Sequence, residues 1–218
     1  PDGKILVAAE AGLRAWELIP QSDGAGGAPF QARLLFQEPG HARNVRIEPK
    51  GGWLGYEGSI HVAGQARGGT FIRGLDPSAT AELVDSHSSA VQSFGIGADG
   101  RTFMHMTMDR ALHLYDSQTR ASVRSFSILA PGEASSNYLL NFSVSPDGSK
   151  VAVANHNGRG VNIHDLASGR RLYSLPDDPG SVWWLAWHPD GRHLAVARGD
   201  GDISLWNLAE VEAVLKSR

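Results

Sequence analysis

Several residues in this sequence could do chemistry if their spacing brought them together. Asp85-Ser86-His87-Ser88 contains the three residue types of a hydrolytic triad. A triad needs side chains that converge from separate elements, which neighbours in one loop do not provide. The sequence also has no Gly-x-Ser-x-Gly turn that would present a nucleophilic serine. We therefore favour a structural role for His87, in which it holds a neighbouring hairpin.

Metal and cofactor sites are not predicted either. The chain has nine His and no Cys, and no two His stand four residues apart on a predicted helix. Four of the His lie on predicted strands, where satisfied or surface imidazoles explain them: His61, His105, His113 and His164. Asp177-Asp178 and Asp200-Gly201-Asp202 are typical of polar turns, with a weak cation site as the alternative. Gly24-Ala25-Gly26-Gly27 lacks the Lys-Ser/Thr ending of a phosphate-binding loop.

The composition excludes other classes of protein. Apolar residues make up 41% of the 218 residues and charged residues 20%, which is typical of a globular chain. The net charge of −3 and the lack of a basic stripe argue against nucleic acid or an anionic membrane as a partner. No apolar run is long enough for a membrane span. The absence of Cys fits a reducing compartment, so we expect a cytoplasmic location.

A repeated turn positions whatever site the chain has. Five related tetrapeptides begin at residues 1, 49, 98, 146 and 189, which gives steps of 48, 49, 48 and 43. They read Pro-Asp-Gly-Lys, Pro-Lys-Gly-Gly, Ala-Asp-Gly-Arg, Pro-Asp-Gly-Ser and Pro-Asp-Gly-Arg. Pro and Asp favour a tight turn and Gly accepts a positive φ. Apolar segments such as Val151–Ala154 follow the turns and are typical of buried strands.

With these turns, the sequence resembles the WD-repeat family. The best match runs from Ser181-Val182 through Asp190-Gly191 and Leu194-Ala195 to Trp206-Asn207. Gly40-His41 and Ser86-His87 stand where a Gly-His pair normally precedes the first strand, and Asp109 and Asp200 occupy the usual acidic position. The side-chain network that often locks a blade in this family is incomplete in every repeat, so we do not predict it.

The resemblance implies an all-β propeller of four-stranded antiparallel blades. The strand count is eighteen, or about four and a half blades of a seven-bladed ring. We expect one propeller domain over residues 1–207, with blades near 1–40, 41–86, 87–137, 138–178 and 179–207, and a helical tail over 208–218. Asn207 is a good N-cap, and Leu208, Val211 and Leu215 share one helix face. The second blade is expected to be irregular, because Gly55, Tyr56 and Gly58 interrupt its strand. The missing blades, on the order of 110 residues at the family period, are expected upstream, and that segment is expected to supply the outer strand of the last blade and so close the ring.

Two adjacent Trp residues mark the most interesting position. Alignment on the turns puts Trp183 level with Arg43, Gln92 and Leu140, and Trp184 level with Asn44, Ser93 and Asn141. Trp is enriched where interface energy concentrates, although one strand could also bury both indoles between blades. For an upper face that binds protein or peptide, the candidate residues are Arg43, His87, Arg110, Trp183, Arg198 and Asp200.

Three functions remain open at this point. The first is a non-catalytic protein-interaction scaffold, which we favour. The resemblance also extends to propellers appended to large bacterial proteins, including serine/threonine kinases, so an attached upstream catalytic domain is one expectation. The second is a propeller enzyme or small-ligand sensor that uses the central channel, which would need converging polar groups there. The third is a structural spacer. Because unpaired strand edges promote association, we expect these 218 residues alone to aggregate.

Overall fold

The computed structural model describes most of the chain. The described residues are 4–9, 12–21, 30–62, 65–87, 91–129, 141–154, 160–175 and 181–217, and the side chains of 60–62, 65–67, 86 and 87 are not described. Two compact units cover Pro1–Phe94 and Gly95–Arg218. Within the described residues, no helix has the length and apolar character that a membrane crossing requires.

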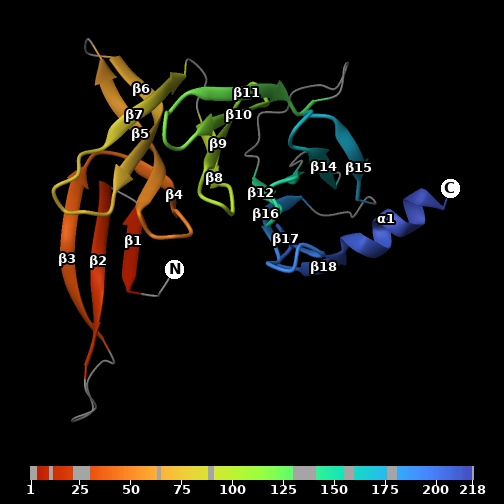
Figure 1. The fold of residues 1–218 in the computed structure, drawn as a ribbon, viewed down its shortest axis with the longest axis horizontal. Helices are drawn as coiled ribbons and strands as arrows, with labels where there is room; N and C mark the ends of the chain where they lie inside the picture. The colour runs from red at the N-terminus through yellow and green to blue at the C-terminus, as the bar shows by residue number, and fades with distance from the viewer. Residues whose placement is uncertain are drawn as a thin grey trace. The chain divides into compact units, whose positions relative to one another are not determined.

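The first unit contains two antiparallel sheets (Figure 1). The first has three strands in sequence order: β1 (Ile5–Ala9), β2 (Gly12–Pro20) and β3 (Phe30–Pro39). The second has four, also in sequence order: β4 (Ala42–Ile47), β5 (Trp53–Val62), β6 (Gln65–Gly74) and β7 (Glu82–His87). The core between them buries Leu13, Ala15, Leu54 and Tyr56.

The second unit contains most of three further sheets, and the boundary between the units falls inside β8. The third sheet comprises β8 (Val91–Ile96), β9 (Thr102–Thr107), β10 (Ala111–Asp116) and β11 (Ser122–Ser127). The fourth comprises β12 (Phe142–Val144), β13 (Lys150–Ala154), β14 (Val161–Asp165) and β15 (Arg171–Ser174). The fifth has three strands: β16 (Val182–Trp187), β17 (His193–Arg198) and β18 (Ile203–Asn207). Among the described residues, the strand pattern of three, four, four, four and three confirms the predicted count.

The predicted turns join the first two strands of each sheet from the second to the fifth. In each of these turns a glycine adopts positive φ, between 70° and 74°, as in Gly51, Gly100, Gly148 and Gly191. The N–H of that glycine donates to the carbonyl three residues earlier, at 2.8–3.0 Å. An L side chain is strained at such φ values, so glycine is the residue that permits this turn.

Two glycines in the strands provide room for buried phenylalanine rings. A Cβ added to Gly55 would lie 2.2 Å from Cζ of Phe94, and one added to Gly95 would lie 2.6 Å from Cε2 of Phe142. Both rings are buried. The prediction that Gly55 interrupts its strand is therefore wrong: β5 runs unbroken through it, and the missing side chain makes space for an aromatic ring.

Helix α1 (Leu208–Lys216) follows β18 directly (Figure 1). The side chain of Asn207 accepts from the Glu210 N–H at the N-cap, as the sequence predicts. Leu208 and Val211 pack on a core formed by the fourth and fifth sheets, whereas Leu215 is 43% exposed and lies outside this contact. Glu212 ties the helix to the fourth sheet, because its Oε1 accepts from Lys150 Nζ at 2.6 Å and Tyr173 OH at 2.8 Å.

Candidate partner-binding site

A β-bulge in the fifth sheet exposes two consecutive indoles. Val182 pairs with Arg198 and Trp184 pairs with Ala197, so Trp183 is the extra residue on β16. Neighbouring side chains of a regular strand point to opposite faces, but a bulge re-aims them locally. Trp183 is 63% exposed and Trp184 47% exposed. Both indoles are therefore exposed in the sheets that the structure describes.

Trp183 lies beside the end of β17. The Gly199 N–H donates to the Ser181 carbonyl at 2.9 Å, and a Cβ added to Gly199 would lie 2.7 Å from Nε1 of Trp183. The guanidinium of the preceding residue, Arg198, donates from Nη2 to Ser204 Oγ at 2.7 Å. The Trp183 indole therefore occupies the space that a side chain at position 199 would need.

Asp200 follows in the turn between β17 and β18. Its side chain is exposed and accepts from the Asp202 N–H at 3.1 Å. Trp183, Arg198 and Asp200 thus come from adjacent segments of one sheet, and we call these three residues the strand-end cluster. An aromatic plane, a guanidinium and a carboxylate together can bury apolar area and form directed hydrogen bonds with a protein partner.

A second exposed surface covers one face of the same sheet. Register places Trp184 level with Ala197 and Ile203, and Ala186 level with Ala195 and Leu205. Ile203 is 74% exposed and Leu205 67% exposed, whereas Leu185, Leu194 and Val196 on the opposite face are buried in the core. We call Trp184, Ala186, Ile203 and Leu205 the open face. Apolar surface of this kind is typical of a face that packs against another layer.

The other predicted site residues are not placed with this cluster. Arg43 is exposed on β4 of the first unit, and His87 ends β7 with a side chain outside the described residues. Arg110 is only 2% exposed, in the turn between β9 and β10. The expectation that Arg110 belongs to an exposed binding face is therefore wrong: its backbone bonds to Thr107 and Ile128 hold it in the turn, with φ of 70°. Desolvation lowers the pKa of its guanidinium.

Two of the positions that align with the Trp residues, both on β8, are buried. Gln92 is 9% exposed and Ser93 6%. Asn44 donates from Nδ2 to Glu57 Oε1 at 2.9 Å and to the Gln92 carbonyl at 3.0 Å. Burial raises the pKa of Glu57 to about 7, partly opposed by the bond from Asn44. Asn44 thus links neighbouring strands, whereas the aligned positions of the fifth sheet carry two exposed indoles.

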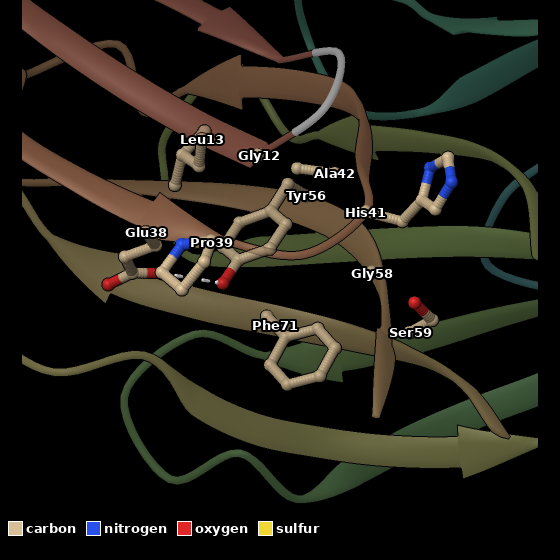
Figure 2. Close-up of a pocket in the computed structure, with 10 residues that line it drawn as sticks. All are labelled: Gly12, Leu13, Glu38, Pro39, His41, Ala42, Tyr56, Gly58, Ser59 and Phe71. Atoms are coloured by element: carbon tan, nitrogen blue, oxygen red, sulfur yellow. Dashed lines mark hydrogen bonds between the residues drawn. The ribbon is translucent and has the colours of Figure 1, made fainter. Parts of the chain in front are cut away.

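The first unit has a pocket of about 160 Å³. Figure 2 shows it bordered by Glu38 and Pro39 on one side and by His41 and Ser59 on the other. The Tyr56 hydroxyl donates to Glu38 Oε2 at 2.9 Å, and Arg73 Nε donates to Glu38 Oε1 at 2.5 Å.

Glu38, which lines this pocket, forms an ion pair with a buried arginine. Arg73 is 3% exposed and its guanidinium lies 3.4 Å from the centroid of the Phe36 ring. Burial raises the pKa of Tyr56, and the bond to Glu38 adds to the effect. Because both carboxylate oxygens of Glu38 accept hydrogen bonds, the group joins β3, β5 and β6 rather than serving as a free base. Sequence reasoning missed this cluster, because Glu38 and Arg73 are 35 residues apart and no local motif links them.

Comparisons with known proteins agree with this architecture. The family model described as "WD domain, G-beta repeat" matches residues 169–207, which span the end of the fourth sheet and the whole fifth sheet. Over 96% of its length, the chain superposes with a TM-score of 0.68 on Sqt1 of Chaetomium thermophilum bound to the N-terminus of ribosomal protein L10. The chain has a β-propeller fold, and residues 169–207 match a WD repeat. The Sqt1 likeness, at 21% identity, concerns the fold and covers 57% of the Sqt1 chain.

Curated relatives match this chain over shorter segments. Autophagy-related protein 18 of Schizosaccharomyces pombe is 30% identical over 86 residues, which cover 38% of this chain and 23% of the relative. The human U5 small nuclear ribonucleoprotein 40 kDa protein is 44% identical over 62 residues, which cover 28% and 17%. RACK1 of Medicago sativa, a small ribosomal subunit protein, is 37% identical over 73 residues, which cover 34% and 22%. The matched segments thus span less than a quarter of these relatives.

Proposed function

We propose that this WD-repeat propeller is a non-catalytic scaffold that binds a protein or peptide through the strand-end cluster. The observation that carries the proposal is the 63% exposure of Trp183 in a β-bulge beside Arg198 and Asp200. A large aromatic side chain held outward by the backbone loses little conformational freedom when a partner covers it. Trp and Arg are also the residue types on which interface energy concentrates.

The Sqt1 structure supports the partner class, since that propeller is bound to the N-terminus of another protein. A net charge of −3 gives no support to nucleic acid or an anionic membrane as a partner. The engaged state of Glu38 supports a non-catalytic role for the first unit's pocket. Binding of a small ligand is the second candidate function, because the same pocket has apolar walls and polar groups at its border.

The proposal includes further blades of the same parent chain as partners. Two sheets have three strands rather than four, and the fifth sheet exposes an apolar face. A further blade would bury that face and pair the edge of β18. A bacterial parent with a serine/threonine kinase domain belongs to the same proposal and is supported by the family resemblance. A cytoplasmic location belongs to it too and is supported by the absence of Cys.

The test is an affinity capture with the full-length parent, compared with a variant carrying Trp183→Ala and Arg198→Ala. A variant with Val123→Ala and Arg192→Ala removes one exposed apolar and one exposed basic side chain elsewhere on the second unit and serves as the matched control. We expect a protein that binds the wild type and the control but not the cluster variant. Equal capture by all three would refute the cluster.

A milder substitution checks the geometry of the site. Gly199→Ala places a methyl group 2.7 Å from Nε1 of Trp183, so the indole must move while the backbone keeps an ordinary φ. We expect weaker capture with nearly unchanged thermal stability. If no form captures a protein but a small molecule raises the melting temperature of the wild type, the pocket rather than the cluster is the binding site.

A further inference from the structure

The turn between β16 and β17 groups two imidazoles around one carboxylate. His188 Nδ1 lies 3.1 Å from Asp190 Oδ1, and His193 Nδ1 lies 2.7 Å from Asp190 Oδ2. One potential ligand atom from each of the three residues lies within 4.8 Å of the others. The His side chains are 58% and 34% exposed, so a hydrated ion can reach them.

The equivalent turn of the fourth sheet shows that the fold does not need these imidazoles. There, Ser145, Asp147 and Lys150 stand at the positions of His188, Asp190 and His193. Both turns have a glycine at φ 70°, and both have backbone bonds of 2.8–3.0 Å at corresponding positions. Ser145 Oγ donates to Asp147 Oδ1 at 2.6 Å. Two ring nitrogens in the fifth sheet are thus additions to a turn that forms without them.

The carboxylate is held in place by the turn. Asp190 Oδ1 accepts from the N–H groups of Arg192 at 2.7 Å and His193 at 3.2 Å. The oxygen Oδ2 therefore points at the His193 ring from an anchored position, as a metal ligand supported by further hydrogen bonds does.

The His188 ring also lies against this carboxylate. Its Nδ1 accepts from the Asp190 N–H at 3.2 Å and faces Asp190 Oδ1 at 3.1 Å. A cation held by Asp190 would therefore also be within reach of this nitrogen.

We propose that His188, Asp190 and His193 form a surface site for a divalent transition-metal ion of the Zn²⁺ and Ni²⁺ class. Metal–ligand bonds of about 2.1 Å at right angles put neighbouring ligand atoms about 3.0 Å apart. The separations from His188 Nδ1 to Asp190 Oδ1, 3.1 Å, and from His193 Nδ1 to Asp190 Oδ2, 2.7 Å, are close to this spacing, so the two oxygens of the carboxylate each face one imidazole. Two imidazoles and one carboxylate suit a borderline ion better than Ca²⁺ or Mg²⁺, which prefer oxygen. Water would complete the coordination shell.

A double substitution tests the site without removing the turn. His188→Ser with His193→Lys recreates the residues found at Ser145 and Lys150, so the hairpin should fold unchanged. The control is His41→Ala, which removes an exposed imidazole from the other unit. Untagged protein is titrated with ZnCl₂ and with NiCl₂ by isothermal titration calorimetry, and circular dichroism verifies that all three forms fold alike.

We expect one saturable site in the wild type and in His41→Ala. The double variant should bind at least about tenfold more weakly, because two of three ligands are gone. With Cu²⁺ as a probe, electron paramagnetic resonance should show coupling to two nitrogens that the double variant loses. Equal affinity in all three forms, or the absence of a saturable site in the wild type, would overturn the proposal. This outcome is independent of partner binding at Trp183.

Discussion

Replacement of Gly55 by alanine should destabilise the second sheet through one contact. The added Cβ would lie 2.2 Å from Cζ and 2.6 Å from Cε1 of Phe94. Ordinary contacts begin at 3.4 Å, so the ring or the strand must move by 3.4 − 2.2, or 1.2 Å. Phe94 is 2% exposed and has little room to move. Overpacking of this kind costs about 1–3 kcal/mol.

The direction of the stability change distinguishes a clash with Phe94 from the usual effect of a Gly→Ala substitution. Where alanine fits, Gly→Ala stabilises a protein by about 0.4–1 kcal/mol, because it restricts the unfolded chain. Gly68 in the neighbouring strand β6 has no atom within 4 Å of an added Cβ. Gly68→Ala is therefore the matched control and should be neutral or stabilising.

Hydrogen exchange with mass spectrometry measures the effect locally, which suits a chain with two compact units. For Gly55→Ala we expect the amides of β5 and β8 to exchange about 5- to 150-fold faster, which corresponds to about 1–3 kcal/mol. Phe94→Leu should lose part of its own packing but restore protection when combined with Gly55→Ala. Unchanged or slower exchange in Gly55→Ala, or additive effects in the double variant, would refute the reasoning.

Three further perturbations probe charge and exposure. Glu57 has a pKa of about 7, above its unfolded value. Its contribution to the free energy of unfolding is therefore full at low pH and is lost as pH rises through about 7. Urea denaturation at pH 5 and pH 8 should show a decline in the free energy of unfolding of at most on the order of 3 kcal/mol, and Glu57→Gln should not show it. The bonds from Lys150 and Tyr173 hold the pKa of Glu212 below its usual value despite partial burial. Protection of α1 against hydrogen exchange should therefore fall as pH drops below the usual glutamate range. Glu212→Gln should remove this pH dependence. Ile203→Lys with Leu205→Glu should reduce self-association in light scattering, because both side chains lie on the open face.

For each of these three predictions, one outcome would contradict it. A stability of the first unit that rises from pH 5 to pH 8 would contradict the buried state of Glu57. Equal protection of α1 in wild type and Glu212→Gln at every pH would show that Leu208 and Val211 hold the helix alone. Undiminished scattering in the charged double variant would assign association to unpaired strand edges instead.

The repeat could be predicted from sequence because local chemistry determines it. A glycine four residues after the first strand of the second to fifth sheets is visible in the sequence, and its positive φ sets where the first two strands of each sheet meet. The N-cap at Asn207 is likewise a local signal. Eighteen strands and their grouping follow from these signals and the period.

Side-chain exposure and distant pairs could not be predicted in the same way. Arg110 sits in a polar turn, yet the fold buries it, and the bond of Glu38 to Arg73 depends on strands far apart in sequence. Gly55 looks like a strand breaker until Phe94 is placed beside it. Helical spacing, in which ligands stand four residues apart, does not find His188 and His193, because a hairpin turn brings together residues five apart.

The recurring glycine turn gives this chain a form of mutational freedom. Gly51, Gly100, Gly148 and Gly191 fix nearly the same backbone in four places, while the residues around them range from Glu48 and Ser145 to His188. A duplicated hairpin can therefore accumulate new side chains at one copy without altering the path of the chain, and the other copies keep the architecture intact. New side-chain chemistry can therefore arise in one turn of such a chain while the other turns stay the same.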